Sequence, residues 1–162
     1  MSDVIIDWKP QTNIEKGTEF ERYVEKMFPE TDYEFLFKSD TVGTKVPDFY
    51  IRDKHTKYKF WVEAKWRSKP TEDDKINIFE DKKDRLNVLL VFQGLVMPER
   101  VFMVLGIGGD PSSPNDVYCI PIPRLEYPSP YLSTLEEFKR GKDCEFTFQP
   151  YSKNLTWATI KK

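Results

Sequence analysis

Three charged residues stand in segments whose other members are typical of buried strands: Asp48, Glu63 and Lys65. Asp48 lies in Val-Pro-Asp-Phe-Tyr-Ile, and the other two lie in Phe-Trp-Val-Glu-Ala-Lys-Trp-Arg. An ionised side chain in a strand that is covered on both faces is costly unless it is paired or holds a metal. Two carboxylates and an ammonium group at this spacing indicate a metal-dependent phosphodiesterase.

The spacing also predicts where these groups lie. Side chains alternate along a strand, so Glu63 and Lys65 share one face. The polar stretch Arg52–Lys57 is typical of a short hairpin loop, and a turn centred near His55 places Asp48 approximately opposite Glu63. Opposed side chains in an antiparallel pair have Cβ atoms about 4.5–5.5 Å apart. Both carboxylates could therefore reach one divalent ion.

Hard oxygen ligands suit Mg²⁺ or Mn²⁺, and Mg²⁺ commonly takes only one or two protein carboxylates. A metal bound by Asp48 and Glu63 would acidify its water and neutralise charge on the phosphate that is attacked. Lys65 could orient the attacking water or stabilise the same charge. Each of the three residues then has a separate task.

Acid-x-Lys spacing alone carries little information, since it recurs at Asp73/Lys75 and Glu137/Lys139. What sets Glu63 and Lys65 apart is the apolar strand around them and a Pro-Asp at hairpin distance upstream. The structural alternative is an exposed edge strand that carries a cross-strand Glu–Lys pair.

Pro47-Asp48 followed by Glu63-Ala64-Lys65 resembles the signature of the PD-(D/E)xK nuclease superfamily, which includes Holliday junction resolvases and type II restriction enzymes. The resemblance implies an α/β, restriction-endonuclease-like mixed β-sheet flanked by helices. It also implies that the Ala64 carbonyl completes the metal shell. The superfamily carries a further acid on a preceding helix, and Glu21 is the matching position here.

That helix can be derived from the residues themselves. Phe20, Val24 and Phe28 recur with helical spacing, and Thr12-Asn-Ile-Glu15 has the form of a capping box, which predicts a helix from about 13 to 27. At about 100° per residue, Glu21 falls on one border of the apolar stripe. Glu19 on the opposite border and Glu25 further out are the alternatives.

The overall charge is not that of a strongly basic nucleic-acid-binding protein, with 25 Lys+Arg against 27 Asp+Glu and a pI near 5.6. DNA binding needs only a local basic face, however, and a hydrolytic site must itself carry acids. Six residues are candidates for that face, with a solvated surface as the alternative: Lys65, Arg67, Lys69, Lys82, Lys83 and Arg85.

The middle of the chain predicts a helix followed by two core strands. Residues from Phe79 to Gln93 fit helical spacing, with Gly94 as the residue that ends the helix and Pro98 beyond it. A strand over 88–92 is the competing interpretation. Strands are expected over 101–107 and 117–122, joined by a turn at Gly108-Gly109 rather than a phosphate-binding loop.

The last third predicts a short helix from Leu132 to Arg140 and then two alternating segments, 144–149 and 155–160. These segments would form a C-terminal β extension, a hairpin that either pads the core or meets a second copy of the chain. The nuclease signature covers only the first half of the sequence and does not specify this part.

A chain of 162 residues can bury a stable hydrophobic core without the help of disulfides or metals, so we expect one nuclease-like domain over 1–162. Cys119 and Cys144 are expected to stay reduced in a cytoplasmic protein without a membrane segment. His55 is expected in the hairpin loop, and Trp66 is more typical of core than of a base-stacking platform.

The sequence therefore predicts a metal-dependent DNA endonuclease, with a homodimer expected because cutting two strands often uses one. Two alternatives stay open. One is a non-catalytic binding or assembly module with the nuclease fold, and the other is an RNA-directed defence nuclease with the same chemistry.

Overall fold

The computed structural model describes residues 12–39, 46–79 and 84–158. Within these residues, six strands form one sheet in the order of their numbers. Neighbouring strands are antiparallel except for β3 and β4, which are parallel. A parallel pair needs a crossover, and α2 supplies it. The strands are β1 (Tyr33–Lys38), β2 (Phe49–Asp53), β3 (Lys59–Arg67), β4 (Arg100–Ile107), β5 (Asp116–Pro121) and β6 (Lys139–Arg140).

Helix α1 (Asn13–Lys26) confirms the first predicted helix. The Thr12 hydroxyl accepts a hydrogen bond from the Glu15 backbone N–H at 3.1 Å, so the cap lies where the sequence placed it. Phe20 and Val24 are buried against the sheet. Ile14, in the first turn of the same helix, is 62% exposed.

Helix α2 (Arg85–Val96) confirms a helix rather than a strand over 88–92. The expectation that Gly94 ends it was wrong, because the helix continues to Val96 and Pro98 follows. Phe79 lies before the helix, and residues 82 and 83 lie outside the described residues. The buried Gln93 amide joins α2 to β4: it donates to the Glu99 carbonyl and accepts from the Val101 N–H, both at 2.7 Å.

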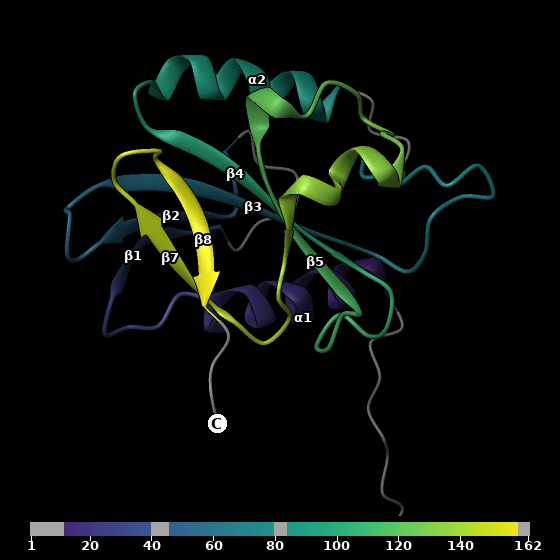
Figure 1. The fold of residues 1–162 in the computed structure, drawn as a ribbon, viewed down its shortest axis with the longest axis horizontal. Helices are drawn as coiled ribbons and strands as arrows, with labels where there is room; N and C mark the ends of the chain where they lie inside the picture. Colours follow the sequence, from purple (N-terminus) through teal and green to yellow (C-terminus); the bar gives the residue numbers. More distant parts are fainter. Residues whose placement is uncertain (1–11, 40–45, 80–83, 159–162) are drawn as a thin grey trace, which may run out of the picture.

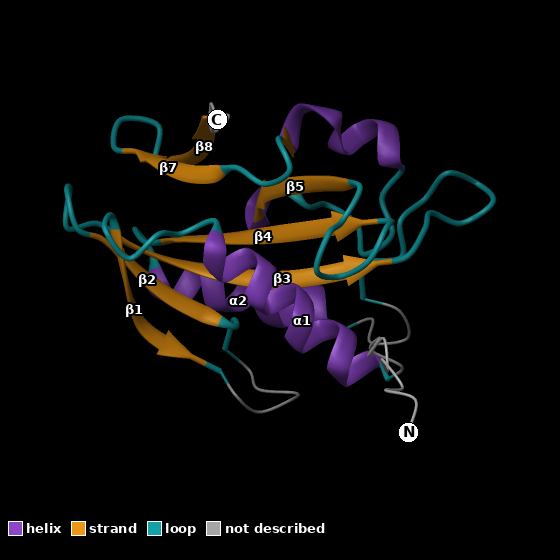
Figure 2. Cartoon of the chain, turned by 90° about the horizontal axis from the view of Figure 1, so that it is seen from below, coloured by secondary structure: helices purple, strands orange, loops and turns teal. Residues whose placement is uncertain are grey.

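Both faces of the sheet are covered by other elements (Figures 1 and 2), and each face carries its own hydrophobic core. One face is covered by α1 and by the hairpin of β7 (Glu145–Gln149) and β8 (Asn154–Ala158). The other face is covered by α2 and two 3-10 segments, η1 (Ile122–Arg124) and η2 (Leu132–Phe138). Strand β3 lies between the cores and contributes side chains to both.

The C-terminal hairpin pads the core. Phe146 and Phe148 are buried beside α1 and β1, and the Tyr33 hydroxyl donates to the Phe146 carbonyl at 2.8 Å and accepts from the Phe148 N–H at 3.0 Å. The helix expected over 132–140 is instead a 3-10 segment that ends at Phe138, because Lys139 and Arg140 pair with β5.

Gly108 and Gly109 have φ values of +76° and +59°, which confirms a turn between β4 and β5. Cys119 and Cys144 are both buried and unbridged. No helix in the described part of the chain has the length and apolarity needed to cross a membrane.

Candidate active site

The hairpin of β2 and β3 places Asp48 beside Glu63. Phe49 faces Val62 in the antiparallel register, so the next step of the ladder sets Asp48 against Glu63. The Asp48 carboxylate accepts a hydrogen bond from the Ala64 backbone N–H at 2.8 Å. The predicted opposition of the two acids is confirmed. The hydrogen bond from the Ala64 backbone holds the Asp48 side chain, which comes just before β2, against β3.

The turn that sets this register is held by another aspartate. Asp53 is buried and accepts hydrogen bonds from the His55 N–H at 3.2 Å and the Thr56 hydroxyl at 2.6 Å. Lys57 adopts a φ of +65°, which reverses the chain into β3. His55 lies in the loop as expected, where its ring is 2.8 Å from Asp32.

Strand β3 is an interior strand, paired with β2 on one side and β4 on the other. The alternative of an exposed edge strand is therefore wrong. Glu63 is 1% exposed, and its neighbour in β4 is the buried Met103. Glu63 and Lys65 point to the face that α2 covers, whereas Val62 and Ala64 point toward α1.

Arg85, the first residue of α2, reaches the buried Glu63 carboxylate. Its Nε and Nη2 atoms donate to one carboxylate oxygen of Glu63 at 2.9 and 2.6 Å. The same Nη2 lies 3.4 Å from the Val46 carbonyl. Because an unpaired buried charge is strongly unfavourable, the guanidinium compensates Glu63 when that carboxyl is ionised.

Sequence reasoning placed Arg85 only in a DNA-contacting basic face and missed its contact with Glu63. One local signal was present: a cation in the first turn of a helix opposes the helix dipole, so it needs a separate partner. The identity of that partner depends on the crossover from β3 to β4, which spacing along the chain does not reveal.

Helix α1 brings Glu21 to the Asp48 carboxyl from the other face of the sheet. The two side chains interact directly, and Glu63 and Lys65 also act on Glu21. The alternatives are placed elsewhere: Glu25 pairs with Lys38 at 3.1 Å, and one oxygen of Glu19 is buried with no hydrogen-bond partner among the described residues. Of the three glutamates, Glu21 is thus the one in contact with Asp48.

The three acids share one electrostatic environment. Burial, reinforced by the adjacent Asp48, raises the pKa of Glu63 to about 8, although Lys65 and Arg85 act in the opposite direction. Burial also raises the pKa of Asp48, and repulsion from Glu21 adds to this. The pKa of Glu21 is raised mainly by burial. Close buried carboxyls of this kind favour either shared protons or a cation between them.

The donors fit a hard cation in chemical type, because Asp48, Glu63 and Glu21 supply carboxylate oxygens. The arrangement differs from a formed metal site in two respects. Within the described ranges, no three His, Cys, Asp or Glu side chains are grouped closely enough to hold a metal. Glu63 also directs one oxygen to Arg85. A metal would have to compete with that guanidinium.

Part of the expected basic face is used within the fold. The Arg67 guanidinium donates to the carbonyls of Trp66, Asn77 and Ile78, which fastens the segment after β3 to that strand. Trp66 donates to the Gly108 carbonyl at 3.1 Å and packs against the first core. Lys69 is exposed.

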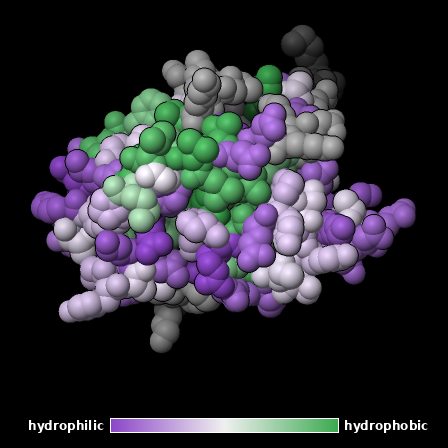
Figure 3. All heavy atoms as spheres, turned by 90° about the horizontal axis from the view of Figure 1, so that it is seen from above, coloured by the Kyte–Doolittle hydropathy of each residue, from purple (hydrophilic) through white to green (hydrophobic). Residues whose placement is uncertain are grey.

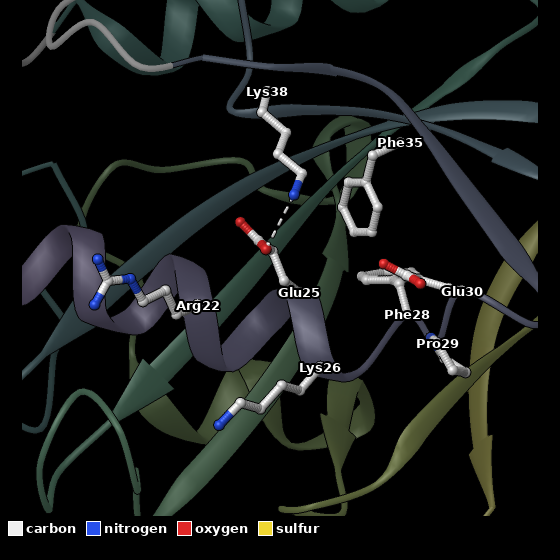
Figure 4. A pocket seen from close by; sticks show the side chains of 8 residues that line it. All are labelled: Arg22, Glu25, Lys26, Phe28, Pro29, Glu30, Phe35 and Lys38. Atoms are coloured by element: carbon white, nitrogen blue, oxygen red, sulfur yellow. Dashed lines mark hydrogen bonds and ion pairs between the residues drawn. The ribbon is translucent and has the colours of Figure 1, made fainter.

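A separate surface hollow of about 380 Å³ lies between α1 and β1 (Figure 4). Lys38 reaches across it to Glu25, with Phe35 and Phe28 beside them. The hollow does not include the acid cluster. The residue after Lys38 donates its backbone N–H to the Asp48 carbonyl at 2.8 Å, which joins the end of β1 to the segment before β2. Arg22 and Lys26 add two further cations to its lining.

Comparisons with protein-family models, with curated proteins and with solved structures gave no match.

Proposed function

We propose that this chain is a metal-dependent endonuclease of restriction-endonuclease-like fold that hydrolyses DNA phosphodiester bonds. The observation that carries the proposal is the buried Glu63 on an interior strand, with Asp48 opposite and Lys65 on the same face. A carboxyl at the centre of a sheet destabilises the fold when it ionises, which favours a chemical rather than a structural role.

In this proposal Asp48 and Glu63 hold Mg²⁺ or Mn²⁺, with the Ala64 carbonyl and Glu21 completing or supporting the shell. When bound, the ion would supply an acidified water and neutralise charge on the phosphate. The hydrogen bond from the Ala64 N–H orients Asp48 before any ligand arrives. Glu21, which touches Asp48 from α1, would accept a proton or steady the water.

Lys65 supplies a positive charge beside the acids, in addition to Arg85. Its ammonium group acts on all three acids, so a phosphate and an attacking water held by these acids would lie close to it. From this position it would orient the nucleophile or stabilise the pentacovalent transition state. It belongs to β3, whose pairing on both sides limits its backbone movement.

The test is cleavage of linear, branched and single-stranded DNA with Mn²⁺ by the wild type and Lys65→Ala. Removing one preorganised electrostatic group commonly lowers a rate by about 10²–10³, so we expect a loss of that size with unchanged circular dichroism. Lys59→Ala is the matched control, because Lys59 is an exposed residue of the same strand. Equal cleavage by the wild type and Lys65→Ala would overturn the assignment, and an RNA substrate in parallel tests the RNA-directed alternative.

A second candidate is a non-catalytic module that keeps the fold and binds a partner. The Arg85–Glu63 pair favours it, because a resident guanidinium can neutralise the ionised carboxylate without a metal. The two candidates differ in metal affinity. A calorimetric Mn²⁺ titration that stays silent for the wild type favours the module, whereas binding that disappears in Asp48→Ala favours the nuclease.

A further inference from the structure

The outward face of α2 is apolar and uncovered. Val91 is 64% exposed, Leu95 78% and Met97 63%, with Leu90 beside them at 37%. In the space-filling view that looks down onto α2, hydrophobic residues form a patch (Figure 3). Large exposed hydrophobic patches on proteins commonly mark interaction sites.

The helix segment that carries this patch is uncharged. Residues 86–98 include no Asp, Glu, Lys or Arg, although such residues make up 32% of the whole chain. Without charges, the face offers nothing to select an acidic or basic partner. It is instead complementary to another uncharged apolar surface, such as its own copy.

Gly94 lies in the middle of the exposed stripe formed by Leu90, Val91 and Leu95. A Cβ atom added to Gly94 would meet nothing within 4 Å, and its φ is not in the left-handed region. The monomer therefore has no steric need for glycine here, although glycine weakens a helix interior relative to alanine. A notch at this position allows another helix to approach the backbone closely.

We propose that α2 packs against α2 of a second copy of this chain, antiparallel across a two-fold axis near Gly94. A two-fold interface uses the same patch on both subunits, and so it requires a self-complementary surface. The uncharged stripe meets that requirement, with Leu95 of one copy filling the notch of the other. This interface is independent of the proposed nuclease activity.

The apolar surface continues from α2 onto the sheet. The Phe92 ring packs edge to face against the Trp61 ring, with 4.8 Å between the ring centroids. The Trp61 and Phe37 ring centroids are 6.4 Å apart. Phe37 is 40% exposed. A standard interface buries about 800 Å² on each partner, whereas a twelve-residue helix is only about 18 Å long. The contact must therefore include this rim, and we expect a reversible dimer with a Kd in the micromolar range.

Sedimentation velocity over roughly 1–200 µM protein tests the interface, because this range spans a micromolar Kd. The wild type should pass from monomer to dimer, and Leu95→Lys should raise the dissociation constant at least roughly tenfold by burying an unpaired charge. Ile14→Lys is the control, since Ile14 is 62% exposed on α1 and should leave the dimer intact. A wild type that stays monomeric, or a Leu95→Lys variant that dimerises normally, overturns the proposal.

Gly94→Ala gives a second test with effects of opposite sign. It should raise the melting temperature of the dilute monomer by about 2–4 °C and weaken the dimer, since the methyl group fills the notch. Gly17→Ala on α1 is matched, because a Cβ there also meets nothing within 4 Å; it should raise stability without changing association. Equal dimerisation by Gly94→Ala and Gly17→Ala contradicts the placement of the two-fold axis.

Discussion

At the scale of residues, the protonation of Glu63 should set the charge of the candidate site. The carboxyl is buried, and with Asp48 beside it the pKa is raised to about 8. Below that pH the Glu63 carboxyl is mostly protonated and neutral. It then carries no charge for a cation or the Arg85 guanidinium to neutralise. The state of Glu63 should therefore couple proton concentration to metal binding.

Mn²⁺ affinity should consequently fall with pH. A ligand that must be deprotonated, with a pKa of about 8, is mostly ionised at pH 8.5 and only a few per cent ionised at pH 6.5. We expect the apparent Kd to be roughly 20-fold higher at pH 6.5, because binding must then release a proton. Titration calorimetry in buffers of different ionisation enthalpy would count that proton. Equal affinity at the two pH values would remove Glu63 from the ligand set.

The residues of the site differ in how far sequence could predict them. The opposition of Asp48 and Glu63 follows from local chain symmetry about the turn near His55, so spacing was sufficient. The contact of Arg85 with Glu63 spans 22 positions and depends on where the crossover helix starts above the sheet. The helical and strand periodicity of the sequence does not indicate that Arg85 and Glu63 meet.

At the scale of elements, a helix was predictable where its period and its cap agreed. Helix α1 has both, with one apolar face and a capping Thr12. Helix α2 lacks a polar face, and Gly94, which the sequence predicts as its end, lies inside it. Glycine destabilises a helix interior by only about 1 kcal/mol, which the burial of Leu86 and Leu89 outweighs.

The placement of Glu21 depends on the close packing of α1 on β4. A Cβ atom at Gly106 would lie 2.4 Å from a ring carbon of Phe20, and that ring is 1% exposed. Gly106→Ala should therefore push α1 from the sheet and lower the free energy of unfolding by about 1–3 kcal/mol, as overpacking commonly does.

Urea denaturation measures this loss, with Gly17→Ala as a control on the same helix that should not lose stability. Because Glu21 follows Phe20 directly, the displaced helix should also change the contact between Glu21 and Asp48. An unchanged unfolding free energy for Gly106→Ala would mean that α1 does not need this close approach.

At the scale of the whole molecule, the acids connect the layers of the fold. Glu21 comes from the helix on one face, Asp48 precedes β2, and Glu63 lies on the interior strand that contributes to both cores. A cation held by these residues would tie α1 to the centre of the sheet. Metal binding should therefore be measurable as stability of the entire chain and not only as local order.

Without a bound metal, the folded protein should be least stable at the pH values at which Glu63 is ionised. Its folded pKa is raised above the ordinary 4.5, so its contribution to stability is complete below about 4.5 and is lost as pH rises through about 8. At pH 8.5, Mn²⁺ at 100 times its Kd should add about 2.7 kcal/mol, which corresponds to roughly 5–10 °C in Tm. Chelation with EDTA should reverse the shift. Lys65→Ala should keep the shift and Glu63→Gln should lose it, because Glu63 is a proposed ligand and Lys65 is not. An equal shift in both variants would place the ion elsewhere on the molecule.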